Sequence, residues 1–261
     1  MIPLIEIKEK AVAEGVPETT VIKDYALSWM LKSVNEISDS FALKGGTGIR
    51  KAYIGGYRFS VDLDFTLTSP VDVRDVLSNA TKLARKESGI EFSADVDVRS
   101  VRTGQEAKIT FRLYYRFPMV IKVDITDPEK ETMVLPLERR TLIHPYSDGC
   151  EVMLLVYSLK EIFAEKVRSL FERTRPRDLY DVWFLSKVID VEDVIPIIVR
   201  KFEHRCVEFQ FDRFIERRNI FRGAWISSLR NQLKELPSFD RAFVEVKDVL
   251  KVIHEHWQVH R

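Results

Sequence analysis

The chain has 261 residues, and its 41 lysines and arginines nearly balance its 40 aspartates and glutamates, which leaves a net charge of +1 at pH 7. This balance excludes a strongly basic molecule, so any nucleic-acid surface must be local. The two cysteines, Cys150 and Cys206, predict neither a disulfide framework nor a metal site, which favours a reducing compartment. Without an apolar run of membrane-spanning length or a signal-peptide pattern, we expect a cytoplasmic protein with no membrane partner.

In chain order, the N-terminal part alternates between helical and extended patterns. An apolar stripe predicts a helix over 18–37, and a short strand over 40–47 leads into a Gly-Gly turn and a helix over about 47–52. A strand over 62–67 and a helix over 71–88, ending near Gly89, follow. Three further extended runs cover about 91–101, 107–116 and 119–126.

After about residue 150 the pattern becomes helical. Ser158 and Glu161 fit an N-cap and the third helical position of a helix that ends near residue 173. Pro176 opens a second helix to Leu185, and helical patterns continue beyond it. The sequence therefore predicts an α+β fold, with a mixed β-sheet flanked by helices in residues 1–148 and a helical domain in residues 149–261.

Two features of the N-terminal part indicate phosphate chemistry. The glycines of Lys44–Thr47 let backbone N–H groups approach phosphate oxygens, because no Cβ intervenes. Asp62 and Asp64 lie two residues apart, so both carboxylates leave the same face of a strand. Such a pair can hold Mg²⁺, which shares oxygen ligands with substrate phosphates. The alternative is a tight turn before an edge strand whose acids are only solvated.

A third carboxylate, Asp124, lies in the predicted strand 119–126, on the face that also carries Lys122. On a strand next to the first two acids it could polarise an attacking hydroxyl or complete a two-metal site. The alternative is an ordinary half-buried strand with its polar residues in water.

Lys166 lies within the apolar stripe of the first C-terminal helix, between Phe163 and Leu170. Its side chain either extends to the edge of the stripe or points into a polar cavity, where it could pair with phosphate. Asp178 and Asp181 share one face of the next helix. They could orient Lys166, bind nucleotide or act as a base, and Asp178 could instead cap the helix.

Arginines gather in two places. One group either holds phosphates or forms a solvated helix end, and consists of Arg168, Arg173, Arg175 and Arg177. Between residues 200 and 230, arginines alternate with phenylalanines and Trp225. This alternation suits RNA binding, but a helical bundle with an aromatic core explains it as well and is favoured.

At these positions the sequence resembles the AbiEii/AbiGii nucleotidyltransferase family. This family comprises toxin components of abortive-infection-type toxin–antitoxin systems within the DNA-polymerase-β-like nucleotidyltransferase superfamily. The resemblance covers residues 18–188 and rests on Val21–Tyr25, Lys44–Thr47, Arg58–Phe65, Glu165–Leu170 and Arg177–Asp181. It implies a nucleotidyltransferase-like sheet followed by a helical domain that contributes Lys166, Asp178 and Asp181 to the site.

The resemblance also implies a role for each residue. The catalytic residues would be Asp62, Asp64, Asp124, Lys166 and Asp181. The nucleotide would contact Lys44, Gly45, Gly46, Thr47, Arg58, Ser60, Lys166 and Asp178. The metal ligands would be Asp62, Asp64 and Asp124, with Mg²⁺ as cofactor, in a one-ion or two-ion site, and an NTP as substrate.

The expected reaction moves an NMP from an NTP to an acceptor hydroxyl, at a tRNA 3′ end or on a protein, and releases pyrophosphate. Lys166 would neutralise charge on the triphosphate, and Asp124 would help to deprotonate the acceptor. The expected partners are the NTP, an RNA acceptor and a cognate antitoxin. Two alternatives are a nucleotide-binding regulator with the same fold and little catalysis, and an interaction protein that acts through a partner.

Overall fold

The computed structural model describes residues 1–259 and divides into two compact units, each considered by itself below. The first unit comprises Met1–Lys130 and Pro136–Tyr157, and the second comprises Glu131–Leu135 and the chain from Ser158 onwards. The chain therefore enters the second unit twice. The sequence placed the division after residue 148, before the last strand of the first unit.

An eight-stranded mixed sheet forms the centre of the first unit. Its strands are β1 (Phe41–Lys44), β2 (Asp62–Leu67), β3 (Glu91–Phe92), β4 (Asp97–Val101), β5 (Gly104–Arg112), β6 (Met119–Thr126), β7 (Glu138–Thr141) and β8 (Met153–Val156). The order is β3-β5-β6-β2-β1-β8-β7, and β4 pairs with β5 beside β3. The pairs β2–β6 and β1–β8 are parallel and the others antiparallel. The predicted mixed sheet is confirmed.

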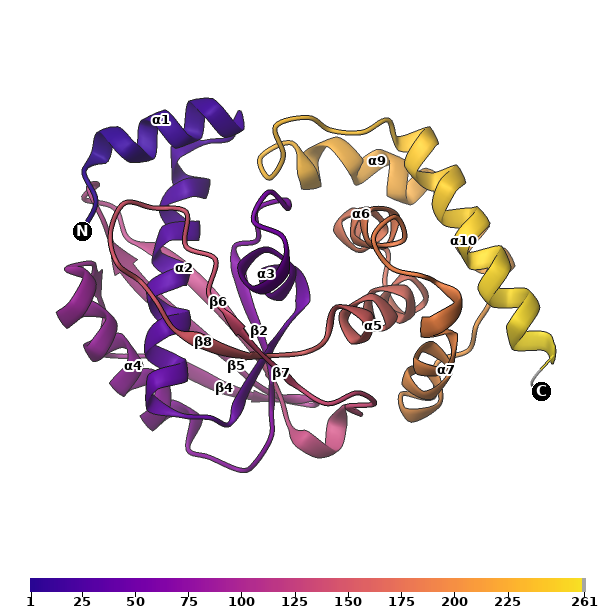
Figure 1. Cartoon of the computed structure of the whole chain (residues 1–261), viewed down its shortest axis with the longest axis horizontal. Coiled ribbons are helices and arrows are strands. Elements are labelled where there is room, and N and C mark those ends of the chain that lie inside the picture. The colour runs from indigo at the N-terminus through magenta and orange to yellow at the C-terminus, as the bar shows by residue number, and fades with distance from the viewer. Residues whose placement is uncertain (260–261) are drawn as a thin grey trace. The chain divides into compact units, whose positions relative to one another are not determined.

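The α-helices of the first unit are α1 (Leu4–Glu14), α2 (Glu18–Ile37), α3 (Gly45–Gly48) with a π-helical turn at Ile49–Tyr53, and α4 (Val73–Ser88), and a 3₁₀ turn occupies Pro128–Lys130. Of these helices, α2 and α4 pack on the apolar face of this sheet. In Figure 1, α2 runs along the sheet. Its buried side chains pack in one core with those of α4 and of the central strands, where Leu63 and Phe65 are fully buried. Burial of this continuous apolar surface holds the layers together.

The predicted strand over 91–101 is instead two strands, β3 and β4. A turn separates them, in which the Asp95 N–H donates to Ser93 Oγ at 3.2 Å. The Ser93 hydroxyl thus offers the backbone a local partner in place of the ladder. The sequence analysis did not predict α1, β7 or β8.

The second unit is a bundle of helices. It contains α5 (Leu159–Glu172), α6 (Pro176–Leu185), a 3₁₀ turn (Glu192–Val194), α7 (Ile195–His204), α8 (Phe211–Glu216), α9 (Arg218–Leu229) and α10 (Phe239–Val259). The predicted N-cap is confirmed, because Ser158 Oγ accepts from the Glu161 N–H at 3.2 Å. Aromatic side chains that alternate with arginines in the sequence, such as Phe202 and Phe221, are fully buried. They form the core of the bundle, as the favoured alternative predicted.

Segment 131–135 is held in the second unit by a buried ionic cluster. The Glu161 carboxylate accepts the N–H groups of Val134 and Leu135 at 2.9 and 2.8 Å. Glu131 forms a two-point pair with the buried Arg168 at 2.8 and 2.9 Å, and Lys201, with no exposed surface, pairs with Glu161 at 2.7 Å. Arg168 is therefore a buried structural cation and does not belong to a solvated helix end.

Among residues 1–259, no helix is both long enough and apolar enough to cross a bilayer.

Candidate active site

The three acids predicted for the N-terminal part meet on one face of the sheet. Asp64 of β2 lies opposite Asp124 of the parallel strand β6, and on its other side opposite Lys44 of β1. Residues directly opposite one another in neighbouring strands point to the same face. Asp62 shares that face because it is two residues from Asp64, and it lies opposite Lys122.

The Gly-Gly-Thr turn approaches these acids closely. Gly45 has a φ of 68°, and a Cβ at this position would lie 2.4 Å from Asp64 Oδ2. Only glycine combines this left-handed backbone with such a close approach. The Thr47 hydroxyl donates to the Asp62 carbonyl oxygen at 2.5 Å, which ties the end of the turn to the start of β2.

Arg58 and Ser60 lie against the same turn. A Cβ on Gly46 would come within 2.8 Å of Arg58 Nη2 and 3.1 Å of Ser60 Oγ. Both side chains are buried, and the guanidinium donates to the Phe59 carbonyl at 3.2 Å. The structure thus brings together every nucleotide-binding residue predicted in the first unit.

A buried ionic cluster that the sequence analysis missed supports this turn. Asp24 of α2 accepts from Arg50 Nε at 2.8 Å and from Lys51 Nζ at 2.7 Å, and both cations follow the turn directly. Lys51 also donates to Ser28, and Tyr146 donates to Asp24, at 2.9 and 2.8 Å. One carboxylate therefore fixes the helical segment that continues from the Gly-Gly-Thr turn.

This cluster has one more positive group than negative groups, because one carboxylate pairs with two cations. Burial alone would raise the pKa of Asp24, but the charges of Lys51 and Arg50 outweigh burial and lower it to about 2. Burial lowers the pKa of Lys51 despite the neighbouring Asp24. The sequence signal that could have revealed this cluster is the position of Asp24 within the apolar stripe of 18–37, since a charged residue is buried there only with partners.

The acids of the first unit suit a metal ion that binds together with a nucleotide. Among residues 1–259, no group of three or more His, Cys, Asp or Glu side chains is arranged to hold a metal ion by itself. Asp62 and Asp64 nevertheless supply the hard oxygen ligands that Mg²⁺ requires. Mg²⁺ is commonly held by one or two carboxylates, with waters and substrate phosphates completing its shell.

The second unit brings together the other predicted residues. Lys166 Nζ lies 2.9 Å from Asp178 Oδ1 and 2.8 Å from Asp181 Oδ2, and both acids are buried. Arg173 Nε lies 2.8 Å from Asp178 Oδ2. Burial would raise the pKa of Asp178, but the charges of Lys166 and Arg173 hold it far below its usual range. Of the roles considered for the two acids, orientation of Lys166 is the one this geometry displays.

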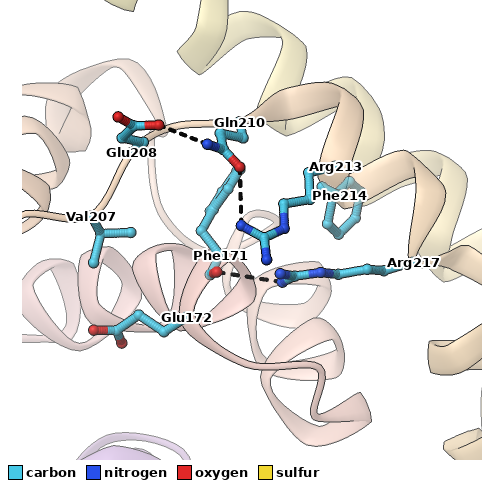
Figure 2. A pocket seen from close by; sticks show the side chains of 8 residues that line it. All are labelled: Phe171, Glu172, Val207, Glu208, Gln210, Arg213, Phe214 and Arg217. Atoms are coloured by element: carbon cyan, nitrogen blue, oxygen red, sulfur yellow. Dashed lines mark hydrogen bonds between the residues drawn. The ribbon is translucent and has the colours of Figure 1, made fainter.

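A depression of about 260 Å³ in the second unit is lined by Phe171 and Glu172 of α5 and by residues of segment 200–230, in which arginines alternate with aromatic residues (Figure 2). Its arginines bind protein groups. Arg217 donates to the carbonyl oxygens of Leu170 and Phe171 at 3.4 and 3.3 Å, and Arg213 donates to Gln210 at 3.2 Å. Arg217 therefore satisfies carbonyls at the C-terminal end of α5, which is a structural role.

Comparison with known proteins gives one family and several structural relatives. The profile of the family described as nucleotidyl transferase AbiEii toxin, type IV toxin–antitoxin system, matches residues 30–246. No curated protein sequence matches the chain.

Two solved structures illustrate the structural similarity. MenT4, a nucleotidyltransferase toxin from Mycobacterium tuberculosis H37Rv, superposes with a TM-score of 0.69 at 20% identity, over 97% of this chain and 90% of that one. JHP933 from Helicobacter pylori gives a TM-score of 0.62 at 17% identity, over 94% of this chain and 97% of that one. At these identities the similarity establishes the fold.

Proposed function

Since the chain belongs to the nucleotidyl transferase AbiEii toxin family and is therefore a nucleotidyltransferase, we propose that it transfers an NMP from an Mg²⁺-bound NTP to the 3′-hydroxyl of an RNA such as tRNA. Membership in a type IV toxin–antitoxin family also implies an antitoxin partner. One observation carries the proposal. Asp62 and Asp64 share the polar face of the sheet with Asp124, next to a glycine turn that leaves no room for a side chain.

Each first-unit residue has a task in this reaction. The backbone of Gly45–Thr47 holds the triphosphate, with Lys44, Arg58 and Ser60 beside it. Asp62 and Asp64, with Asp124 as a further ligand, would hold Mg²⁺, which supplies charge neutralisation at the phosphates. The acceptor oxygen forms a bond to the α-phosphorus while the bond from that phosphorus to the pyrophosphate oxygen breaks. The acceptor proton passes to Asp124.

In the second unit, we assign charge compensation to Lys166. Its ammonium would stabilise negative charge that develops on the departing pyrophosphate, as positioned cations do in phosphoryl transfer. Asp178 and Asp181 hold that ammonium in one place, at 2.9 and 2.8 Å. In this proposal Asp181 acts by fixing Lys166, and Asp178 contributes to the same cluster.

The test incubates the purified chain with each α-³²P-labelled NTP, Mg²⁺ and total tRNA. We expect label on tRNA with the native chain and none with Asp62→Asn/Asp64→Asn. The matched control is Asp39→Asn/Asp95→Asn, which removes the same charge from two exposed positions and should keep the activity.

The other outcomes separate the alternatives. Label on a protein would retain the chemistry and change the acceptor. Binding of NTP and Mg²⁺ without transfer to any acceptor would contradict the proposal and support a nucleotide-binding regulator.

A further inference from the structure

The polar face of the sheet continues beyond the acids onto β5 and β4. There, a depression of about 250 Å³ is lined by charged side chains of β4, β5 and β6, among them Lys108, Lys122 and Asp124. All of it lies within the first unit. The lining contains both acidic and basic side chains, so this depression is not a general binding site for polyanions.

Two lysines of neighbouring strands lie side by side in this depression. Lys108 of β5 is the direct ladder partner of Lys122 of β6, and both side chains are exposed. In the described chain, residues 1–259, neither lysine makes an ion pair or a hydrogen bond through its side chain. Like charges directly opposite one another destabilise a sheet. On its other side each lysine has an acid directly opposite, Asp97 for Lys108 and Asp62 for Lys122, but among residues 1–259 neither lysine forms an ion pair with that acid. Both ammonium groups are therefore available to an anionic ligand that binds between them.

The neighbouring charges further restrict which class of anionic ligand fits. Arg99 Nε binds Glu106 at 3.0 Å, so these two charges offset each other. Asp124 follows Lys122 by two residues, which places its side chain on the same face about 6.6 Å further along the strand. A matching ligand carries an anion at one end and a hydroxyl at the other. A nucleotide with a 5′-phosphate and a free 3′-hydroxyl has this arrangement, with a similar spacing.

The strand order places this ligand on the acceptor side. The order is β5-β6-β2-β1, so β2 with its two acids lies between the lysines and the glycine turn that follows β1. In an in-line displacement, the attacking and leaving oxygens lie on opposite sides of the phosphorus. A triphosphate held at the glycine turn leaves the far side, towards Lys122, for the acceptor.

We propose that Lys108 and Lys122 form a subsite for the backbone phosphate of the 3′-terminal nucleotide of a nucleic-acid acceptor. This inference rests on the proposed function, because it takes Asp62 and Asp64 as the reaction centre. It favours a polynucleotide acceptor over a protein hydroxyl, which carries no phosphate at the required spacing.

The test measures binding directly, so that it does not depend on catalysis. The probe is a short single-stranded oligoribonucleotide with a 5′-fluorescein and a free 3′-hydroxyl, titrated with the full chain and followed by fluorescence anisotropy. We expect Lys108→Gln/Lys122→Gln to weaken binding about tenfold. The slope of log K against log salt should become shallower by about 0.7, which corresponds to one phosphate contact on a single strand.

The matched control is Lys82→Gln/Lys86→Gln, which removes two exposed lysines from one face of α4 and gives the same net charge. We expect the control to bind the probe as the native chain does. A second probe replaces the last phosphodiester by a neutral methylphosphonate. The native chain should bind this second probe about tenfold more weakly than the first. The Lys108→Gln/Lys122→Gln variant should bind the two probes with equal affinity, because it lacks the lysines that would contact the replaced phosphate.

Three results would overturn the inference: native affinity in the Lys108→Gln/Lys122→Gln variant, an equal loss in the control, or a native chain that does not bind the probe at low salt. Failure of the proposed function has a different signature. If lysine-dependent binding is seen but no NTP gives transfer, the subsite survives and the reaction does not. Transfer to protein with no effect of the lysines would remove the subsite and leave the chemistry.

Discussion

Asp24 is the residue whose replacement tests the support of the Gly-Gly-Thr turn most directly. Asp24→Asn keeps the side-chain volume and removes the negative charge that neutralises Arg50 and Lys51, which are only 5% and 1% exposed. Removal of one partner of a buried ion pair typically costs about 3–5 kcal/mol, because the remaining charge stays buried without compensation. Here two cations remain, so we expect a loss of unfolding free energy of about 4 kcal/mol.

Lys51→Met is the informative comparison. It removes the surplus cation and leaves the Arg50–Asp24 pair neutral, so only hydrogen bonds are lost, and we expect about 1–2 kcal/mol. The double variant Asp24→Asn/Lys51→Met should be more stable than Asp24→Asn alone, because it contains one unpaired buried cation in place of two.

The assay is urea denaturation of the full chain, followed by far-UV circular dichroism, for the native protein, both single variants and the double variant. The order of stability is the decisive result. If Lys51→Met destabilises the chain as much as Asp24→Asn, or if Asp24→Asn costs less than about 1 kcal/mol, the cluster does not hold the turn by charge compensation.

The pH dependence supplies an independent check on Asp24. Its pKa of about 2 in the folded chain lies below the ordinary value of 3.8, so the unfolded chain takes up this proton first as the pH falls. The stability contributed by Asp24 is complete above about pH 5 and is lost as the pH falls towards 2. In Asp24→Asn this part of the acid destabilisation should be absent.

Three further predictions concern other parts of the chain. Gly45→Ala should lower transfer activity about 100-fold or more, because its Cβ would displace the Asp64 carboxylate, whereas Gly56→Ala, where a Cβ meets nothing within 4 Å, should keep native rates. The free energy of unfolding of Asp178→Asn should fall less on acidification than that of the native chain. Asp178 has a strongly lowered pKa, so the stability that its carboxylate contributes disappears as the pH falls. An unchanged acid-denaturation profile would contradict this. At pH 8 a thiol reagent should modify one cysteine of the native chain and both cysteines of the unfolded chain. The reason is that Cys206 is exposed, whereas burial raises the pKa of Cys150 to about 12. Rapid modification of both cysteines in the native chain would contradict this prediction.

The elements that carry the site were predictable because their signals are local. The alternation around Asp62 and Asp64 gave the correct bounds of β2, and the apolar stripe of 18–37 gave those of α2. The position of Asp124 opposite Asp64 depends on the pairing of β2 with β6, which are far apart in the sequence. Spacing along the chain supplies a shared face within one strand, but it does not supply a neighbouring strand.

The parts that were missed depend on long-range partners. Glu161 fits the third position of a capping box, yet its carboxylate accepts backbone N–H groups from Val134 and Leu135. Arg168 lies near the end of a helix, where an exposed arginine is common, but it is buried against Glu131. In both cases the deciding partner lies in segment 131–135, which has no periodic pattern of its own.

Segment 131–135 also determines how the two units could be separated or exchanged. A fragment that begins at Ser158 would lack Glu131 and would leave Arg168 and Lys201 without one of their carboxylates. A fragment that begins at Glu131 would carry β7 and β8 away from the sheet to which they belong. No single cut of the chain therefore yields two self-sufficient halves, and recombination at one breakpoint cannot transplant either unit intact. The same interleaving means that the helical unit completes its charge network only with residues that precede the last two strands of the sheet in the chain.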